Sequence, residues 1–183
     1  MNFFFPLKIP LQMRATLITI LASVIATIAS GKTAYLIRHG EKPENNKDKN
    51  LSPAGYARAE CLASKVFAGS STQFKPPAAL MAQRPVKGDM SLRPIETLTP
   101  LSKTLGIEIQ TPCTFDEHQC AIDYINNQTA YPLVVAWEHK NLAEILTQLT
   151  DSADPIKYPG DRFDLVWKYD VKSRTYETFY EDC

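Results

Sequence analysis

Short apolar segments of strand character alternate with helical segments along most of this chain of 183 residues. Strands that are joined through a helix run parallel, with helices on both faces of their sheet. The segments with strand character are 33–38 (TAYLIR), 78–83 (AALMAQ), 107–110 (IEIQ) and 131–137 (YPLVVAW), and those with helix character are 51–67, 91–106, 116–127 and 141–149. The order predicts an α/β fold, a three-layer α/β/α sandwich with a mostly parallel central sheet. The tail, 162–182, alternates apolar and polar residues around DVKSR and predicts a C-terminal antiparallel hairpin.

Residues 1–30 are set apart from the predicted domain, 31–183. Two basic residues precede a long apolar run that has no charge before Lys32 and ends in small residues. This layout is typical of a secretory signal peptide, with cleavage after Ala29 or Ser30. The alternative is a membrane anchor, because the uncharged run approaches the ~18 residues at which spanning becomes credible. We favour the cleaved signal, which predicts a secreted protein without stable membrane association.

Secretion changes how the four cysteines are interpreted. An even number of cysteines in an oxidising compartment predicts two disulfides, for which three connectivities exist. Cys113 and Cys120 bracket a short loop, so they are expected to pair, and Cys61 would then pair with Cys183. A zinc site is the alternative, but no two cysteines have the CxxC spacing. We therefore expect two disulfides and no metal.

The balance of charge excludes some partners. Twenty basic residues match twenty acidic residues, so no overall field attracts a nucleic-acid backbone or an anionic membrane surface. We expect no nucleic-acid partner. If the protein selects anions, the selectivity has to come from positive charges gathered at one site rather than from the net charge of the chain.

Cationic and titratable side chains stand where the predicted parallel strands end. Arg38 and His39 close the first strand, and His139 follows the strand at 131–137. Arg93 lies near the start of a helix, where backbone N–H groups and the helix dipole attract anions. Ligands of such sheets gather beyond the carboxyl ends of the strands. These four side chains are therefore predicted to surround one phosphoryl group.

The residue types suit chemistry at phosphorus. Two guanidinium groups can each hold two oxygens of a phosphoryl group. A neutral imidazole can attack phosphorus, and the resulting phosphohistidine divides one difficult displacement into two easier ones. A second, protonated imidazole would neutralise the charge that builds on the oxygens. This chemistry requires no metal or organic cofactor, and none is expected.

Four motifs also carry a family resemblance. LIRHGEK, LSPAGYARA, SLRPIET and VVAWEH resemble, in their order and spacing, the histidine phosphatase superfamily, also called the phosphoglycerate mutase-like family. The resemblance implies a phosphoglycerate mutase-like fold. It also implies a phosphate pocket made by Arg38, His39, Arg93 and His139, in which His39 becomes phosphorylated. Members typically hydrolyse phosphomonoesters, and less often they move phosphate within a sugar acid.

The leaving group of such a reaction needs a proton donor, and the residues beside the second histidine, where a donor could lie, depart from the family pattern. Many members have a glycine before the second histidine or an aspartate after it, whereas this chain has Glu138 and Lys140. In phosphoglycerate mutase-like members the acid lies after the second arginine, which here points to Glu117 or Asp116. Glu138 and Glu41 are alternatives. Without a competent acid, only substrates with good leaving groups, such as acyl phosphates or phosphohistidine, would react well.

These features favour a secreted, metal-independent phosphomonoesterase that acts on a phosphorylated substrate through a phosphohistidine on His39. The alternative is a family member without phosphatase turnover that serves as a binding module or uses the pocket for other acid–base chemistry. A phosphoglycerate-type mutase is less favoured, because its substrates are intracellular.

We expect the secreted protein to begin at residue 30 or 31 and to contain two disulfides. Its intact mass should correspond to loss of the predicted signal and should rise by about 4 Da on reduction, since each disulfide takes up two hydrogens. Mass spectrometry before and after reduction measures both quantities. An uncleaved mass would indicate an anchor, and an unchanged mass on reduction would contradict the oxidised state.

Overall fold

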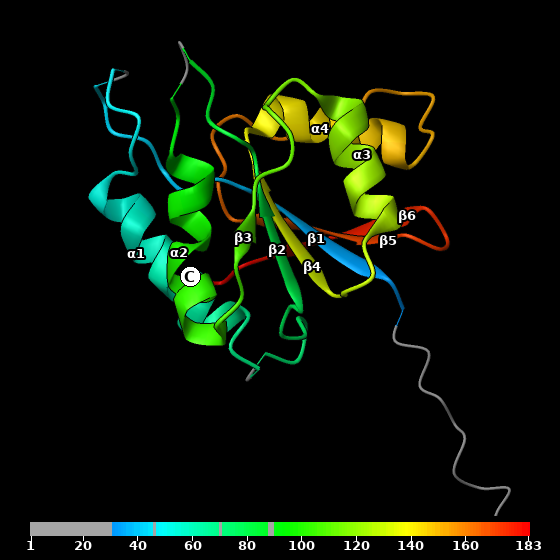
Figure 1. The fold of residues 1–183 in the computed structure, drawn as a ribbon, viewed down its shortest axis with the longest axis horizontal. Coiled ribbons are helices and arrows are strands. Elements are labelled where there is room, and N and C mark those ends of the chain that lie inside the picture. Colours follow the sequence, from blue (N-terminus) through cyan, green and yellow to red (C-terminus); the bar gives the residue numbers. More distant parts are fainter. Residues whose placement is uncertain (1–30, 46, 70, 88–89) are drawn as a thin grey trace, which may run out of the picture. The chain divides into compact units, whose positions relative to one another are not determined.

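The computed structural model describes residues 31–45, 47–69, 71–87 and 90–183, so the predicted signal segment lies outside the described residues. The expected strands and helices follow one another in the expected order (Figure 1). They are β1 (Thr33–Arg38), α1 (Pro53–Cys61), the π-helical segment η2 (Leu62–Val66), β2 (Ala79–Ala82), α2 (Arg93–Leu105), β3 (Ile109–Gln110), α3 (His118–Asn127), β4 (Leu133–Trp137), α4 (His139–Leu149), β5 (Leu165–Asp170) and β6 (Thr175–Tyr180). Among these helices, none is both long and apolar enough to cross a membrane.

The strands form one mixed sheet in the order β3-β2-β4-β1-β5-β6. The pairs β2–β3, β2–β4 and β1–β4 are parallel, whereas β5 runs antiparallel to both β1 and β6. Arg38 pairs with Trp137, and Ala82 pairs with Ala136, so β1, β2 and β4 end close together. The predicted parallel core and the predicted C-terminal hairpin are both confirmed.

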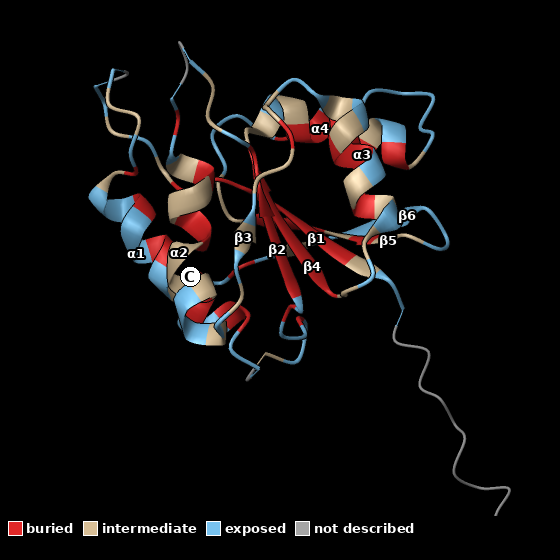
Figure 2. Cartoon of the chain, in the orientation of Figure 1, coloured by how far each residue is buried: buried red, intermediate tan, exposed pale blue. Residues whose placement is uncertain are grey.

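Helices cover both faces of the sheet (Figure 1). Tyr35 and Ile37 of β1 pack in a core with residues of η2 and α2, while Ala34 and Leu36 pack in a second core with α3 and α4. This alternation follows from the two-residue period of a strand. Figure 2 shows β1, β2 and β4 buried along their length, whereas β6 at the edge is largely exposed. The predicted three-layer sandwich is confirmed.

Local signals explain the helix ends. Ser52 caps α1, because its Oγ accepts a hydrogen bond from Gly55 N at 3.1 Å, and Pro53 occupies the first turn. Gly106 ends α2 with a φ of 66°, which glycine adopts without strain. A proline inside a helix can kink or divide it, yet α2 continues past Pro100 without division. The helix expected at 51–67 changes at its end into the π-helical segment η2.

Both predicted disulfides are present. The Cys113–Cys120 bridge closes the loop that precedes α3. The Cys61–Cys183 bridge ties the end of α1 to the residues that follow β6. None of the four cysteines is free.

A buried ion pair lies beside the Cys61–Cys183 bridge. Arg58 of α1 donates from Nε and Nη2 to the two carboxylate oxygens of Glu181, both at 2.5 Å. Its Nη1 also donates to the carbonyl of Arg38 at 3.3 Å. Burial would raise the pKa of Glu181 and lower that of Arg58, but the bidentate contact favours both charges, and we take the pair as ionised. The ion pair therefore fixes the Arg58 side chain where it binds the backbone at the end of β1.

Removing one partner of this buried pair should strongly destabilise the fold. Glu181→Leu leaves the Arg58 guanidinium buried without a counter-charge, and we expect a loss of about 3–5 kcal/mol in the free energy of unfolding. The double variant Arg58→Met/Glu181→Leu should lose less, because it removes both charges. Urea unfolding measures these differences.

The matched control is Arg84→Met. Arg84 pairs with Glu117 at 3.3 Å, and both side chains are 48% exposed. Its removal should cost less than about 1 kcal/mol, as for other surface ion pairs. A Glu181→Leu protein as stable as this control would contradict the role given to the buried pair.

Candidate active site

Arg38, His39, Arg93 and His139 line one cavity of about 360 Å³. The end of β1 supplies Arg38 and His39, while Arg93 and His139 begin α2 and α4. His39 N donates to the carbonyl of Trp137 at 3.0 Å, which ties the ends of β1 and β4 together. The structure therefore brings the four predicted side chains to one place. The other lining residues are Lys42, Gln83, Ser91, Phe115, Glu138, Lys140 and Asn141.

Two glycines allow α1 to pack closely against the segment after β1. A Cβ atom on Gly55 would lie 2.5 Å from the carbonyl oxygen of Glu41, and one on Gly40 would lie 3.0 Å from the carbonyl oxygen of Gly55. Ser52 N donates to the carbonyl of Glu41 at 2.9 Å. Side chains at these glycines would push the two segments apart. The RHG and LSxxG motifs thus form one packed unit that fixes the backbone at His39.

The motif around Arg93 ties the start of α2 to the same unit. Glu96 Oε2 accepts a hydrogen bond from Leu51 N at 2.7 Å. Thr97 Oγ1 accepts from Gly40 N at 2.8 Å and donates to the carbonyl of Arg93 at 2.7 Å. We predicted a role only for Arg93 in this motif. The sequence did contain a signal for the other two: Glu96 and Thr97 are polar residues in the first turns of the helix, and they lie between the apolar residues Ile95 and Leu98.

The His39 ring is fixed by a hydrogen bond to the backbone. Its Nδ1 lies 2.7 Å from the carbonyl oxygen of Gly40. A carbonyl only accepts, so the proton is on Nδ1 and the lone pair is on Nε2. Burial lowers the His39 pKa to about 4, and the charges of Arg93 and Arg38 act in the same direction. At neutral pH the ring is therefore a neutral imidazole, the form that can act as a nucleophile.

The Arg38 guanidinium is held by the loop that precedes β5. Its Nη1 donates to the carbonyls of Gly160 at 3.0 Å and Arg162 at 2.5 Å, and its Cζ lies 3.6 Å from the centre of the Phe163 ring. Burial lowers its pKa, but an arginine remains charged in a protein. The Nε atoms of Arg38 and Arg93 are buried and have no hydrogen-bond partner within the described part of the chain. An anion that supplied acceptors would remove this cost.

Glu138 caps α4 and lies against His139. Its Oε2 accepts hydrogen bonds from the backbone N atoms of Lys140 and Asn141, both at 3.0 Å. Its Oε1 lies 2.7 Å from His139 Nδ1, within ion-pair distance but without the alignment of a hydrogen bond. Burial raises the pKa of Glu138, but the hydrogen bonds from Asn141 and Lys140 outweigh burial and lower it. Burial and the charge of Arg38 lower the pKa of His139, and Glu138 opposes them.

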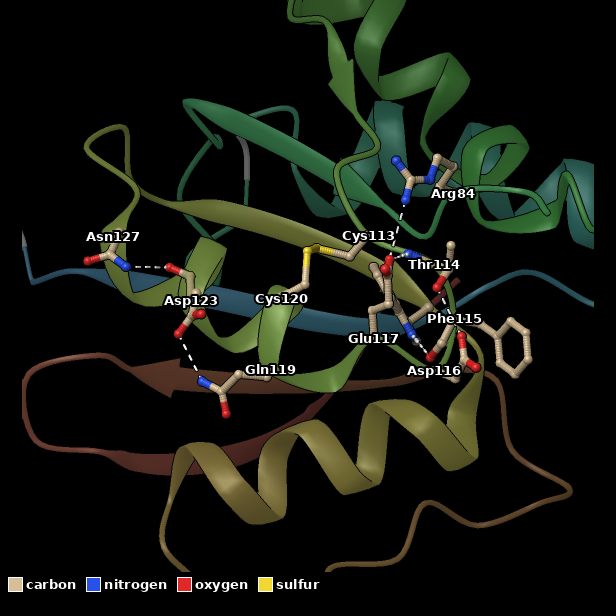
Figure 3. Close-up of a disulfide and its surroundings, with 11 residues drawn as sticks. Arg84, Cys113, Thr114, Phe115, Asp116, Glu117, Gln119, Cys120, Asp123 and Asn127 are labelled. Atoms are coloured by element: carbon tan, nitrogen blue, oxygen red, sulfur yellow. Dashed lines mark hydrogen bonds and ion pairs between the residues drawn. A yellow bond between two sulfur atoms is a disulfide. The ribbon is translucent and has the colours of Figure 1, made fainter.

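Glu117, the first candidate for the proton donor, is not among the described residues that line the cavity. It accepts a hydrogen bond from Thr114 N at 2.7 Å and faces Arg84 (Figure 3). The hydrogen bond from the Thr114 backbone lowers the pKa of Glu117. These contacts favour an exposed carboxylate at this position and give no support to its role as a proton donor.

The other carboxyl candidates differ in position. Asp116 accepts a hydrogen bond from Thr114 Oγ1 at 2.9 Å on the same loop (Figure 3). Glu41 lines a separate hollow beside Arg58. Glu138 alone, of the carboxyl groups in the described part of the chain, lines the cavity itself.

The cavity lining is strongly cationic. Arg38, Lys42, Arg93 and Lys140 line it against the single carboxylate of Glu138. In a chain with no net charge, this concentration of positive charge is local. It favours a dianionic phosphoryl group and repels divalent cations.

Comparison with protein-family models and with curated proteins finds no match. The fold does match solved structures. Protein histidine phosphatase SixA complexed with tungstate aligns with a TM-score of 0.59 at 13% identity, over 81% of this chain and 97% of that chain. A SixA protein from Nakamurella multipartitia aligns with a TM-score of 0.52 at 17% identity, over 82% and 95%. A mycobacterial glucosyl-3-phosphoglycerate phosphatase in complex with inorganic phosphate aligns with a TM-score of 0.51 at 12% identity, over 80% of this chain and 95% of that chain.

At these identities the likeness concerns the fold. It confirms the predicted phosphoglycerate mutase-like architecture and, at the level of the fold, the resemblance to the histidine phosphatase superfamily that the motifs indicated.

We expect His39 to titrate at about pH 4 in the folded protein, against about 6.5 in the unfolded chain. Between these values the unfolded state binds more protons, so stability falls as the pH is lowered from about 6.5 to about 4. The contribution of this group is on the order of 3 kcal/mol. NMR titration of the imidazoles measures the pKa directly.

A His39→Asn protein should lose this part of the pH dependence of urea unfolding while keeping the contributions of the carboxylates. Equal pH dependence in the two proteins, or a His39 midpoint near 6.5, would contradict a buried neutral imidazole.

Proposed function

We propose that this chain is a secreted, metal-independent phosphomonoesterase that forms a phosphohistidine on His39. One observation carries the proposal: two arginines and two histidines, supplied by three separate segments, line a single cationic cavity, with Arg38 and His39 buried and Arg93 and His139 half-buried. The Nε atoms of Arg38 and Arg93 lack acceptors within the described residues, and a phosphoryl group would provide them. The fold shared with solved phosphatases supports the same conclusion.

The reaction has two displacements. In the first, the Nε2 lone pair of His39 attacks phosphorus, the bond from phosphorus to the leaving group breaks, and the leaving group takes up a proton. In the second, water attacks the phosphohistidine, the phosphorus–nitrogen bond breaks, and phosphate leaves with His39 neutral again. Arg38 and Arg93 hold the phosphoryl oxygens through both steps, and His139 stabilises the charge that develops there.

Two further features support the remaining parts of the proposal. The cationic lining stabilises the phosphoryl charge with side chains alone, so the chemistry needs no metal ion. The two disulfides suit an oxidising, extracytoplasmic compartment.

We expect the purified mature protein to release p-nitrophenol from p-nitrophenyl phosphate between pH 5 and 8, equally with and without a chelator. His39→Ala should reduce the release at least about 1000-fold, because it removes the nucleophile. Rapid quenching in alkali should trap a labelled phosphate that is lost on acid treatment, and only in proteins that retain His39.

Arg93→Ala should lower kcat/KM by about 100-fold or more, because it removes a charged contact to the phosphoryl group. The matched control is Arg174→Ala in the β5–β6 turn, where the arginine pairs with the exposed Asp151. This control should retain activity. Absence of turnover on every phosphoester, together with absence of phosphoenzyme, would favour a binding module. Interconversion of phosphoglycerate isomers would indicate a mutase.

A further inference from the structure

The proposed reaction needs a proton donor for the leaving group, and the cavity offers no neutral carboxylic acid. Glu138 is the one carboxyl group among its described lining residues, and its hydrogen bonds favour the ionised form. Glu138 also occupies the position before the second histidine, where the motif departs from its usual pattern. The contacts of Glu138 indicate what this carboxylate does.

One oxygen of Glu138 is fully occupied by donors from the start of α4. Oε2 accepts from Lys140 N and Asn141 N at 3.0 Å, and from Asn141 Nδ2 at 2.9 Å. On the other side, Glu138 N donates to Gln83 Oε1 at 2.9 Å. The residue is therefore held both through its backbone and through its carboxylate. Its second oxygen, Oε1, is left beside His139 Nδ1 at 2.7 Å.

His118, which carries no role in the proposed reaction, completes this arrangement. Its Nε2 lies 2.7 Å from Asn141 Oδ1, and an amide oxygen only accepts, so Nε2 carries the proton. This contact directs the Asn141 amide group toward Glu138. Four side chains from α3 and α4 and the residue before α4 therefore form one connected series: His118, Asn141, Glu138 and His139.

We propose that Glu138 is a positioning carboxylate that holds Nδ1 of His139 toward Oε1, so that Nε2 of His139 faces the phosphoryl group and donates the proton to the leaving group. This inference rests on the proposed function. The contact between Oε1 and Nδ1 is short but not aligned as a hydrogen bond, and contacts of this kind tighten when substrate binds.

The proton balance is complete with His39 and His139 alone. In the first displacement the proton on His139 Nε2 moves to the leaving oxygen as the bond from that oxygen to phosphorus breaks. In the second, neutral Nε2 takes a proton from the attacking water as the phosphorus–nitrogen bond breaks. Glu138 stays ionised throughout and stabilises the imidazolium form.

The charges around His139 determine when it carries this proton. Burial lowers the pKa of His139, and the charges of Arg38, Lys140 and Lys42 act in the same direction, whereas Glu138 raises it. The Tyr158 ring packs at 6.3 Å and stays uncharged, because burial raises the pKa of its hydroxyl. Glu138 and the bound dianion are therefore the groups that favour the imidazolium form of His139.

Glu138→Gln tests this role, since glutamine retains an oxygen that can cap α4 and removes the charge. We compare kcat/KM, which reports the first displacement, for p-nitrophenyl phosphate, whose leaving group needs no proton, and for glycerol 2-phosphate, whose leaving group does. We expect a loss of about 100-fold or more on glycerol 2-phosphate and less than about 5-fold on p-nitrophenyl phosphate. The alkaline fall of kcat on glycerol 2-phosphate should move to lower pH by at least about one unit.

The matched control is Glu144→Gln, at an exposed residue on the same helix, which should change neither the activity on either substrate nor the pH profile. Glu138→Asp keeps the charge, so the alkaline fall of kcat on glycerol 2-phosphate should stay at the same pH. Equal losses on both substrates with an unmoved profile would show that Glu138 only caps α4, and would overturn the inference while leaving the proposed function intact. A wild-type protein that turns over neither substrate and traps no phosphoenzyme would instead overturn both.

Discussion

The parallel pairing of β1 and β2 with β4 is the constraint on which the cavity depends. It places the ends of three strands at one edge of the sheet, so residues distant in sequence, such as Arg38 and His139, become neighbours. The close contact between Gly40 and Gly55 then fixes the first of these ends against α1. A backbone held in this way determines the direction of each side chain before any ligand arrives. The proposed binding of a phosphoryl group would therefore require little reorganisation of the protein.

The polar contacts around the cavity form two layers. The inner layer is cationic and is aimed at a ligand. The outer layer holds the inner one in place: Arg58 binds the carbonyl of Arg38, Thr97 binds the backbone at Gly40, and Glu138 lies against His139. The cost of burying the Arg38 charge is thus offset partly by its hydrogen bonds to the carbonyls of Gly160 and Arg162 and partly by the anion that the cavity favours.

The sequence was sufficient for the features that depend on periodicity and chain order. Alternating strands and helices predicted the layers, and the ends of the strands predicted where Arg38 and His39 would lie. It was insufficient where the partner of a side chain is decided by packing between distant segments. The ion pair between Arg58 and Glu181 joins a residue on α1 to one after β6, and no local sequence pattern predicts it. The expectation for Glu117 came from family position alone, and the contacts of its own loop, which the sequence did not show, decide its state.

The place of β1 in the sheet has a consequence for how the protein is made. β1 lies near the amino terminus of the domain, yet it sits between β4 and β5, which are synthesised roughly a hundred residues later. The centre of the sheet therefore cannot assemble as the chain emerges, and its contacts have high sequence separation, which slows folding. Until β4 and β5 arrive, the apolar β1 has no strand partners and is open to wrong association. A chain of this topology is expected to need chaperone protection until its last third has been synthesised.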